Sequence, residues 1–501
     1  MKFTFSWLKE HLETTATANA VAQKLTSLGL EVESCVDIGA KYAPFLVAEI
    51  LEATKHPNAD KLRVCKVNTG TEVLQIVCGA PNARAGIKVC LAPVGALIPN
   101  GNFAIKKSKI RDVESCGMLC SSAELELGAD GDGIMELPLD AQVGSKFADL
   151  CGLNDILFEI AITPNRADCL SVRGVARDLA AGSLGVLKPL EVKSAISNQK
   201  SKISVTSESY YIGRYFAGVN NTKSPQWLAS RLKSIGLTPI SALVDITNYF
   251  TFNFGRPLHV YDADKLSGKL QVTSCKKAKF NALNNKTYEL EGDLVVADDN
   301  GSVALAGVIG NVETSVDENT KNVFLEIAYF DPAQVAANGR KHQIDSDARY
   351  RFERGIDADF MEEAANWATK FITDICGGTP SELVVAGQKP STKREVEFDI
   401  NFINEYTGLS IAESKAKEIL QSLGFEFTPL PTSPLRGEKW GVVVPSWRSD
   451  VMGKEDLAEE VVRIIGLDNV PLQPLPYAAP VKNTAKNIKQ IMAANGLTEV
   501  V

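Results

Sequence analysis

Hydrophobic spacing divides the chain into helical and strand-like stretches from its first residues onward. In residues 1–38, apolar positions recur three or four residues apart and end at a glycine: Val21, Leu25, Leu28 and Gly29. This spacing lines one face of an α-helix, and glycine is typical just beyond a helix C-terminus. Thr15 or Thr17 can cap the start of that helix. The pattern predicts a helix followed by a strand.

The pattern changes between residues 39 and 151, where short apolar runs replace the helical spacing. Three of these runs are 62–67, 74–77 and 88–91, and turns rich in Gly, Pro and Asn separate them. Alternating apolar and polar positions between such turns are typical of strands. Short strands at this spacing predict a small closed barrel, and the five-stranded oligonucleotide-binding barrel is one candidate.

Beyond residue 152 helices and strands mix again. A strand at 156–162 and a polar turn at 163–168 lead into a helix that runs to about Leu184. We therefore predict a multidomain α+β fold in which the barrel is inserted into one small α+β domain. The predicted ranges are 1–38 with 152–190, then 39–151, 200–388 and 392–474, followed by residues 475–501.

Two features of the last region are also expectations of the sequence. The proline-rich segment 429–434 predicts a surface loop. Near the end, a helix begins at about Asn487 and a strand follows before Val501. A strand that starts there with no partner in view predicts a fragment of a longer chain.

Composition narrows the class of protein. With 501 residues the chain is too long for one ordinary core, and 45% hydrophobic with 23% charged residues is typical of globular domains. No apolar run reaches the roughly 18 residues of a membrane helix, and residues 1–13 lack the apolar core of a secretory signal. A net charge of −8 excludes a generally basic coat, so any RNA contact must come from local patches.

The cysteines point to a reducing compartment. Ten are scattered along the chain without a CxxC pair, and Cys116 and Cys120 have no second pair to complete a zinc site. Reduced, buried thiols and a cytoplasmic location are expected.

An acid inside an apolar strand is the most informative feature of the sequence. Glu326 follows Leu325 and precedes Ile327, and an ionised carboxylate buried without partners costs several kcal/mol. Two interpretations stay open. The carboxylate forms a salt bridge with one of the arginines in the polar turn that follows, or it lines a specificity pocket. Those arginines are Arg349, Arg351 and Arg354.

His259 is one of only four histidines and lies among apolar and aromatic neighbours in the run 255–262. A histidine whose hydrogen bonds are satisfied in the core is one reading. A role in a pocket is the other, provided that Gly307, Gly310, Glu326 and Ser346 converge on it in the fold.

Two segments of the predicted barrel carry local positive charge. One is the turn 56–62 and the other is 106–111, which contains three lysines and an arginine. A basic rim can follow a phosphate backbone, whereas a solvated lysine face needs no ligand. Aromatic residues that could stack on bases are scarce here, which favours the solvated face.

Four acids cluster around a helix expected from about Glu455 to Ile465: Asp450, Asp456, Glu459 and Glu460. Spacing places the last three on the face opposite the apolar residues. Like charges three or four residues apart repel each other by a few tenths of a kcal/mol. A hard divalent cation, magnesium rather than zinc, would offset that repulsion, but a plain acidic surface near a helix N-terminus is equally compatible.

In their order along the chain, several short motifs together resemble the β subunits of bacterial phenylalanyl-tRNA synthetases. They are Phe5–Leu8, His56–Leu62, Gly117–Ser121, Thr163–Cys169, Asp245–Tyr249, Gly255–Asp262, Gly307–Asp357 and Pro445–Arg448. Each motif alone is weak, but their joint order is specific, and the resemblance covers essentially the whole chain.

The resemblance implies an assembly of two α and two β chains. In it, the α subunit charges tRNA(Phe) with phenylalanine at the expense of ATP. The β chain would contribute a tRNA-binding barrel at 39–151, central editing domains at 200–388 and a winged-helix-like B5-type domain at 392–474. Residues 475–501 would begin a synthetase-like module. No membrane is involved in such an assembly.

The resemblance also implies roles for single residues. The editing pocket for mischarged Tyr-tRNA(Phe) corresponds to His259, Gly310, Glu326, Ser346 and Ala348, and Glu326 would bind the tyrosine hydroxyl. The family often has threonine where Ser346 stands, so the hydroxyl is kept and a methyl group is lost. The magnesium ligands correspond to Asp450, Asp456, Glu459 and Glu460.

Two other classes of protein compete with this reading. One is a stand-alone tRNA-binding or assembly protein that shares only the barrel, and the other is a hydrolase that edits mischarged tRNA without a synthetase partner. A buried acid and an acidic helix are features that a simple binding module does not need.

Overall fold

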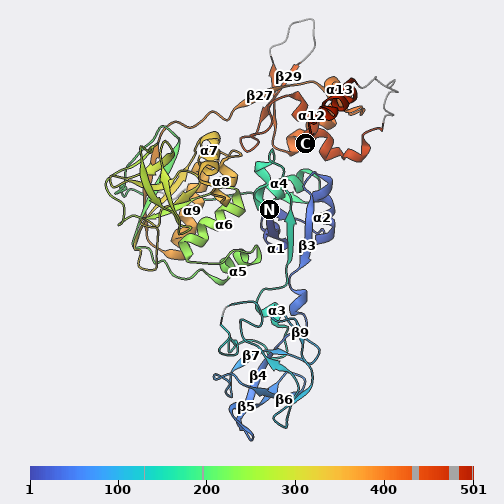
Figure 1. Cartoon of the computed structure of the whole chain (residues 1–501), viewed down its shortest axis with the longest axis vertical. Coiled ribbons are helices and arrows are strands. Elements are labelled where there is room, and N and C mark those ends of the chain that lie inside the picture. The colour runs from blue at the N-terminus through green and yellow to red at the C-terminus, as the bar shows by residue number, and fades with distance from the viewer. Residues whose placement is uncertain (129, 194–196, 431–438, 473–483, 499, 501) are drawn as a thin grey trace.

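The computed structural model describes residues 1–128, 130–193, 197–430, 439–472, 484–498 and 500. The chain contains both helices and strands in several separate sheets, and the predicted multidomain α+β class is confirmed. The molecule is elongated, with the strands of residues 46–137 at one end and the larger body of the chain at the other (Figure 1). Among the described residues, every helix is too short or too polar to cross a bilayer.

The N-terminal part is a three-stranded antiparallel sheet of order β1-β14-β3 covered by helices. Its elements are β1 (Lys2–Thr4), α1 (Phe5–His11), β2 (Leu12–Glu13), α2 (Ala18–Ser27), β3 (Val32–Asp37), β14 (Ile156–Ile160), α4 (Val172–Ala181) and β15 (Val186–Leu187). Thr17 caps α2 by accepting a hydrogen bond from the backbone of Ala20, and Gly29 turns the chain at φ +86°. The predicted helix and strand are confirmed, with Thr17 rather than Thr15 as the cap.

Between β3 and β14 the chain leaves this sheet and builds another of order β12-β7-β4-β5-β6, in which β13 also pairs with β7. The elements are β4 (Leu46–His56), β5 (Ala59–Asn68), β6 (Val73–Cys78), β7 (Lys88–Ala92), β8 (Leu97–Ile98), β9 (Phe103–Ala104), β10 (Ser108–Ile110), β11 (Val113–Ser115), β12 (Met118–Leu119), β13 (Glu136–Leu137) and α3 (Phe147–Leu150). The three strands expected from the apolar runs are therefore present. Side chains alternate between the two faces of β4, so the neighbouring residues Val47 and Ala48 enter two different core clusters.

The central part contains a four-stranded sheet, β18-β25-β17-β26, and a five-stranded sheet, β16-β19-β22-β23-β24. Its strands are β16 (Val205–Thr206), β17 (Tyr211–Ala217), β18 (His259–Asp262), β19 (Leu270–Ser274), β20 (Ala278–Asn281), β21 (Thr287–Leu290), β22 (Leu294–Ala297), β23 (Ser302–Leu305), β24 (Ile309–Gly310), β25 (Asn322–Ala328) and β26 (Thr379–Ala386). Its helices are α5 (Gln226–Ser234), α6 (Ala242–Phe254), α7 (Pro332–His342), α8 (Asp347–Phe352) and α9 (Met361–Cys376).

The four-stranded sheet has a core on each face. Side chains alternate along a strand, so Leu325 and Ile327 of β25 pack into the cluster shared with α6 and α9. Phe324 and Ala328, on the opposite face, pack into the cluster that the five-stranded sheet supplies. Glu326 shares this second face. It therefore points into the space between the two sheets.

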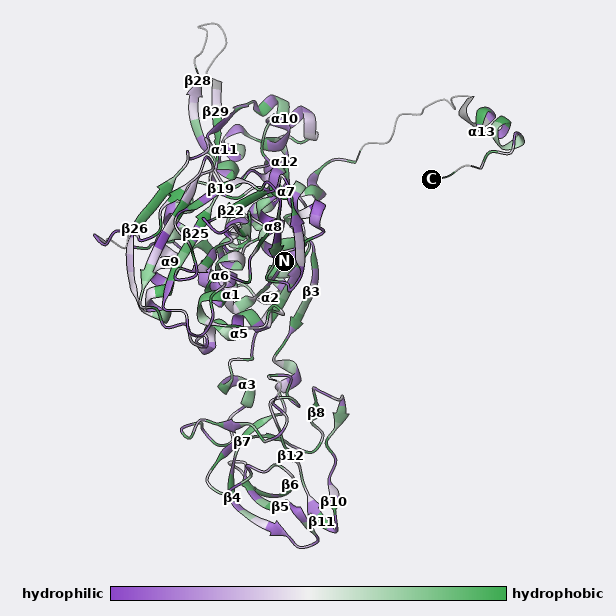
Figure 2. Ribbon diagram, turned by 60° about the vertical axis from the view of Figure 1, so that its left-hand side comes forward, coloured by the Kyte–Doolittle hydropathy of each residue, from purple (hydrophilic) through white to green (hydrophobic). Residues whose placement is uncertain are grey.

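The C-terminal part is a three-stranded sheet of order β27-β29-β28 packed on three helices. Its elements are β27 (Arg394–Phe398), α10 (Ile400–Thr407), α11 (Glu413–Ser422), β28 (Glu426–Leu430), β29 (Lys439–Val444) and α12 (Lys454–Ile465), and α13 (Thr484–Ala494) follows. In Figure 2, β28 and β29 lie side by side at the end of the body opposite β4 to β12. The prediction of a surface loop at 429–434 is wrong for Pro429 and Leu430, which pair with β29 as the end of β28. Residues 431–434, and the last part of the predicted terminal strand, lie outside the described residues.

Candidate functional site

Glu326 is the centre of a polar site inside an otherwise apolar layer. Only 7% of its surface is exposed. The phenol groups of Tyr211 and Tyr261 both donate hydrogen bonds to its Oε2 oxygen, each over 2.8 Å. The other oxygen, Oε1, accepts no hydrogen bond from any residue that the structure describes. The carboxylate is thus held from one side and keeps one acceptor free.

Strand pairing brings His259 to this carboxylate. In the antiparallel pair of β18 and β25, His259 stands directly opposite Glu326. The imidazole ring meets the Tyr261 ring edge-on with centroids 4.4 Å apart. Its Nε2 atom is buried and has no hydrogen-bond partner among the described residues. The reading of His259 as a satisfied core histidine is therefore wrong.

Gly310 forms the wall that faces the imidazole. A Cβ atom added to Gly310 would lie 2.5 Å from Cε1 and 2.8 Å from Nε2 of His259. Contacts below about 3 Å are essentially never seen for real Cβ atoms, so no side chain fits here without moving the ring. Gly310 thus permits the close approach of β24 to β18.

Ser346 and Ala348 lie at the start of α8, next to the segment that contains Gly310. Ser346 caps α8, because its hydroxyl accepts a hydrogen bond from the backbone of Arg349, and it donates to the carbonyl oxygen of Val308 over 2.7 Å. Val308 is two residues from Gly310, so the cap ties α8 to β24. Ala348, in the first turn of α8, packs partly buried against the same core cluster.

Gly307 has a different role from the one expected of it. Its φ is +69°, and an added Cβ would meet Val335 and Phe352 rather than the Glu326 site. Gly307 therefore allows the turn before β24 and does not line the pocket.

Electrostatics fix the protonation of the imidazole and the phenols. Burial raises the pKa of Glu326, while the hydrogen bonds from both tyrosines and the charge of Arg256 lower it. Burial also lowers the pKa of His259 to about 4, so the imidazole is neutral near pH 7. The pKa values of Tyr211 and Tyr261 are raised well above their usual range by burial and by Glu326, which keeps both phenols protonated as donors.

The alternative of a salt bridge to Glu326 is wrong. Arg349 pairs with Glu353 over 3.0 Å, and Arg354 pairs with the same carboxylate over 2.7 Å. Arg351 pairs with Asp347 over 3.1 Å. All three arginines therefore pair with acids of their own segment, Asp347 and Glu353.

The two basic segments at the far end of the molecule come together. His56 Nε2 lies 3.0 Å from the carbonyl oxygen of Ile110, and the Asn58 side chain donates to the carbonyl oxygen of Arg111 over 3.1 Å. The hairpin of β10 and β11 therefore rests on the turn between β4 and β5. Lys61, Lys106 and Lys109 are exposed beside it and, among the described residues, take part in no ion pair.

The four acids around α12 do not gather into one ligand set. Asp450 and Glu460 both accept hydrogen bonds from Arg448, over 2.7 and 2.8 Å, and Glu460 also pairs with Arg463. Asp456 accepts from the backbone of Met452 and Gly453 at the start of α12, and Glu459 is exposed.

Placing Glu460 on the solvent side of α12 was wrong, because the side chain is buried between two arginines. Repulsion among these acids was the reason to expect a cation, but guanidinium groups already neutralise Asp450 and Glu460. The arrangement therefore does not fit a four-carboxylate magnesium site, and no chemistry is assigned to a metal here.

One other group of potential ligands exists among the described residues, and it fails for the same reason. Ligand atoms of Asp168, Cys169 and Asp178 lie within 4.8 Å of one another. However, Arg166 donates to both carboxylates, over 3.0 and 2.9 Å, and approaches the thiol. A guanidinium occupies the place that a cation would take.

Three family models match successive parts of the chain. A putative tRNA binding domain matches residues 45–146, a B3/4 domain matches 207–377, and a tRNA synthetase B5 domain matches 396–467. The phenylalanine--tRNA ligase beta subunit of Rhodospirillum rubrum is 46% identical over 520 residues, across 100% of this chain. That of Rhodopseudomonas palustris is 45% identical over 518 residues, again across all of this chain.

The chain belongs to the phenylalanine--tRNA ligase beta subunit family. It spans 64% of the length of these relatives. A solved N-terminal fragment of the phenylalanyl-tRNA synthetase beta-subunit from Pyrococcus horikoshii covers 62% of this chain at 18% identity with a TM-score of 0.33. That likeness is too weak to support a conclusion.

Within this family fold, the B3/4 match contains every residue of the Glu326 site. Sequence reasoning missed Tyr211 and Tyr261. Tyr261 could have been found, because it lies two residues after His259 and so shares its face of a strand. Tyr211 could not, because nothing local in the sequence connects it to a residue 115 positions away.

Proposed function

We propose that this chain hydrolyses the ester of mischarged Tyr-tRNA(Phe) as the editing part of a phenylalanine--tRNA ligase, with the pocket at His259, Gly310, Glu326, Ser346 and Ala348. The observation that carries the proposal is the free Oε1 oxygen of Glu326. Two phenols hold the carboxylate by its other oxygen, so Oε1 is preset to accept a hydrogen bond from a third phenol, that of tyrosine.

Discrimination follows from what each amino acid does at that oxygen. A pocket that only admits or excludes a ring separates tyrosine from phenylalanine by about 10²-fold. A buried acceptor does better, because phenylalanine would leave it desolvated and unpaired at a cost of about 1–3 kcal/mol or more for a charged group. Tyrosine would satisfy it. The site would therefore retain the mischarged ester and release the correct one.

Hydrolysis would use a positioned water molecule. The described residues of the pocket hold no serine or cysteine nucleophile paired with a base: Ser346 is committed to capping α8 and to Val308. His259 is neutral and its Nε2 atom has no partner, so it can hold a water molecule or the ester carbonyl in place. Orientation of this kind supplies much of a barrier reduction without covalent catalysis.

We assign tRNA binding to residues 39–151, as an oligonucleotide-binding barrel. The exposed lysines along the β10–β11 hairpin and the adjoining turn support a contact with phosphates rather than with base edges. The C-terminal part, 392–474, is proposed as a winged-helix-like B5-type domain, and the predicted domain boundaries stand as part of this proposal.

The partners and cofactors belong to the same proposal. The chain would assemble with an α subunit as a heterotetramer that charges tRNA(Phe) with phenylalanine and ATP in the cytoplasm. Magnesium would enter with ATP at the α subunit. The alternative of a stand-alone tRNA-binding or trans-editing protein is not favoured, because the relatives across the whole chain are ligase beta subunits.

The test is deacylation of purified Tyr-tRNA(Phe) and Phe-tRNA(Phe) by the assembled tetramer. Glu326→Ala should reduce the preference for the tyrosyl ester about tenfold or more, and His259→Ala should slow hydrolysis of that ester. Glu289→Ala, an exposed acid on β21, is the matched control. An unchanged preference in Glu326→Ala would remove the assignment, and copurification of an α chain decides between the tetramer and a stand-alone protein.

A further inference from the structure

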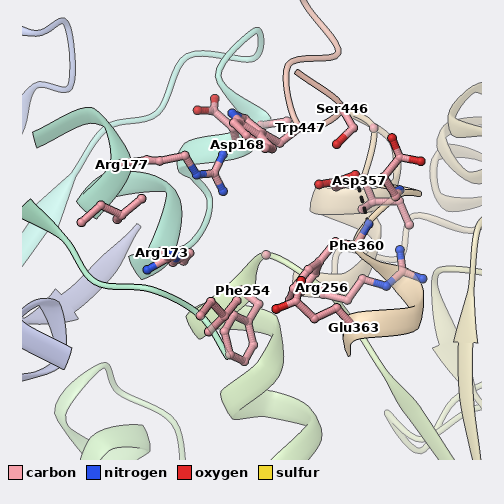
Figure 3. A pocket seen from close by; sticks show the side chains of 17 residues that line it. Asp168, Arg173, Arg177, Phe254, Arg256, Asp357, Phe360, Glu363, Ser446 and Trp447 are labelled. Atoms are coloured by element: carbon pink, nitrogen blue, oxygen red, sulfur yellow. Dashed lines mark hydrogen bonds between the residues drawn. The ribbon is translucent and has the colours of Figure 1, made fainter. Parts of the chain in front are cut away.

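A second, separate cavity lies where the N-terminal, central and C-terminal parts of the chain meet. Its volume is about 430 Å³, within the range of about 300–1,000 Å³ of small-molecule sites. Figure 3 shows its labelled residues around an open middle. Arg173 and Arg177 come from α4, and Phe254 comes from the end of α6. Asp357 and Phe360 come from the segment before α9, and Trp447 comes from the segment between β29 and α12.

Arg177 is the residue of this cavity that indicates a ligand. Its guanidinium stacks on the Trp447 ring, with 4.2 Å between the Cζ atom of Arg177 and the ring centroid. This contact holds the guanidinium in one orientation. Its Nη1 atom is buried without a hydrogen-bond partner among the described residues, and Arg177 forms no ion pair with any of them. A buried, oriented guanidinium with a free N–H is an incomplete site.

The acids around the cavity do not complete it. Asp168 is engaged by Arg166 over 3.0 Å, and Asp359 is engaged by Lys389 over 2.8 Å. Asp357 accepts hydrogen bonds from the backbone N–H groups of Asp359 and Phe360.

Three cavity arginines, Arg173, Arg177 and Arg256, are in no ion pair among the described residues, whereas two cavity acids, Asp357 and Glu363, are likewise unpaired. Arg177 thus has no carboxylate of a described residue at ion-pair distance, and burial lowers its pKa by more than the charges of Asp168 and Asp357 offset. Arg173 donates one hydrogen bond to the carbonyl oxygen of Lys188, and Arg256 donates one to the carbonyl oxygen of Ala328.

Apolar side chains make up much of the remaining wall. The rings of Phe254 and Phe360 pack against each other at an angle of 49°, with 5.5 Å between their centroids, and Leu187 and Leu190 line the same space. Aromatic walls with a few fixed polar groups are the usual composition of a site for an organic ligand rather than for an inorganic ion.

We propose that this cavity binds a small organic oxyanion that carries a planar apolar body. Its carboxylate or phosphate meets the guanidinium of Arg177, and its body lies against Phe254, Phe360 and Trp447. Guanidinium recognises both kinds of oxyanion through paired hydrogen bonds. Because three parts of the chain contribute to the walls, the bound ligand also holds them together. The site is independent of the editing pocket proposed above.

The experiment is isothermal titration calorimetry on the 501-residue chain with three probes. 3-Phenylpropionate and phenyl phosphate carry the two oxyanions, and 3-phenylpropanol has the same body without charge. We expect at least one of the anions to bind with a Kd of about 1 mM or tighter, and the alcohol at least tenfold more weakly. The anion that binds more tightly identifies the class of ligand.

Variants locate the binding. Arg177→Gln should weaken it about ten- to hundredfold, the loss expected for charge-assisted hydrogen bonds. Leu190→Trp fills the cavity without a change of charge and should have a similar effect if Arg177→Gln fails to fold. Arg340→Gln, an exposed arginine on α7, and Glu326→Gln, in the editing pocket, should bind as the parent does.

Three results would overturn the proposal. They are no heat of binding with either anion up to about 10 mM, equal binding of 3-phenylpropanol, or unchanged binding in both Arg177→Gln and Leu190→Trp. Loss of binding in Glu326→Gln alone would assign the probe to the editing pocket and likewise reject this cavity.

Discussion

Tyr211 and Tyr261 hold Glu326 by one oxygen, so each phenol is expected to contribute to stability as well as to editing. Tyr261→Phe removes one of two hydrogen bonds to a buried acid, each 2.8 Å long. Hydrogen bonds to charged groups are worth about 1.5–3 kcal/mol. We expect the free energy of unfolding to fall by that amount, measured by urea denaturation.

The matched control for Tyr261→Phe is Tyr288→Phe. Within the part of the chain that the structure describes, the Tyr288 hydroxyl has a hydrogen bond only with the exposed side chain of Asn284, and its loss should cost less than about 0.5 kcal/mol. Equal effects of the two substitutions would mean that the Glu326 carboxylate does not depend on its phenols.

The pKa of His259 gives a second expectation. Folding lowers that pKa from its ordinary value of 6.5 to about 4, because burial disfavours the charged ring. The stability that depends on a neutral His259 is complete above pH 6.5 and is lost as the pH falls toward 4. His11, whose pKa burial also lowers to about 4, adds a similar loss.

His259→Gln removes one of these two titrations. Between pH 7 and pH 5, its free energy of unfolding should therefore fall less steeply than that of the parent chain, as followed by denaturant unfolding at each pH. His11→Gln serves as the comparison, since it removes the other titration outside the pocket. A parent and a His259→Gln variant with the same slope would show that the ring is not held neutral by burial.

Single residues of the site were predictable where the sequence broke a local pattern. Glu326 interrupts an apolar strand, and this alone marked it for a role. Its binding partners were not predictable, because hydrogen bonds across 65 and 115 positions depend on which strands become neighbours. Composition favoured an arginine as the partner, yet the arginines of α8 pair with acids of their own segment, which are closer in sequence.

At the scale of elements, the approach of β24 to β18 depends on Gly310. Gly310→Ala would place a methyl group 2.5 Å from the His259 ring, and overpacking of this kind costs about 1–3 kcal/mol. The imidazole or the strand must shift, so deacylation of Tyr-tRNA(Phe) by the tetramer should slow about tenfold or more.

Gly131→Ala is the matched glycine substitution, because its added methyl would lie 3.5 Å from Ala123, an ordinary contact. It should leave both stability and deacylation close to those of the parent. If Gly310→Ala edits as fast as Gly131→Ala, His259 has no part in the reaction.

Helices and strands followed from the sequence more closely than their faces did. The period of apolar residues found α2, the strands β5 to β7 and α12 within a few residues of their observed ends. The same reasoning placed Glu460 on the outer face of α12, where the structure buries it. An apolar stripe shows which side of a helix enters the core, but it does not show that arginines from other segments also enter there and carry acids with them.

At the scale of the whole molecule, a buried chain of charges joins parts that are distant in sequence. Arg166 of the N-terminal part pairs with Asp168 and Asp178, and Asp178 pairs in turn with Arg463 of α12. Arg463 and Arg448 share Glu460. Three arginines and four acids, counting Asp450, thus form one network between α4 and α12. It explains why the acidic helix does not repel itself.

Arg463 is the member that bridges the two parts, so its removal tests the network. Arg463→Met leaves Asp178 and Glu460 each short of a partner in a buried site, and breaking a buried ion pair on one side costs about 3–5 kcal/mol. The free energy of unfolding at pH 7 should fall by that amount. Lys370→Met breaks an exposed pair with Asp374 in which both side chains are more than half exposed, and it should cost less than about 1 kcal/mol.

The pH dependence separates a charge effect from a packing effect. Arginines 448 and 463 lower the pKa of Glu460 to about 2, against burial that raises it. A depressed carboxyl pKa gives stability that is complete above the ordinary value of 4.5 and is lost as the pH falls toward 2. The difference in unfolding free energy between the parent and Arg463→Met should therefore shrink between pH 5 and pH 3. A constant difference would mean that Arg463 acts through its aliphatic packing, and the network would not be what joins α12 to α4.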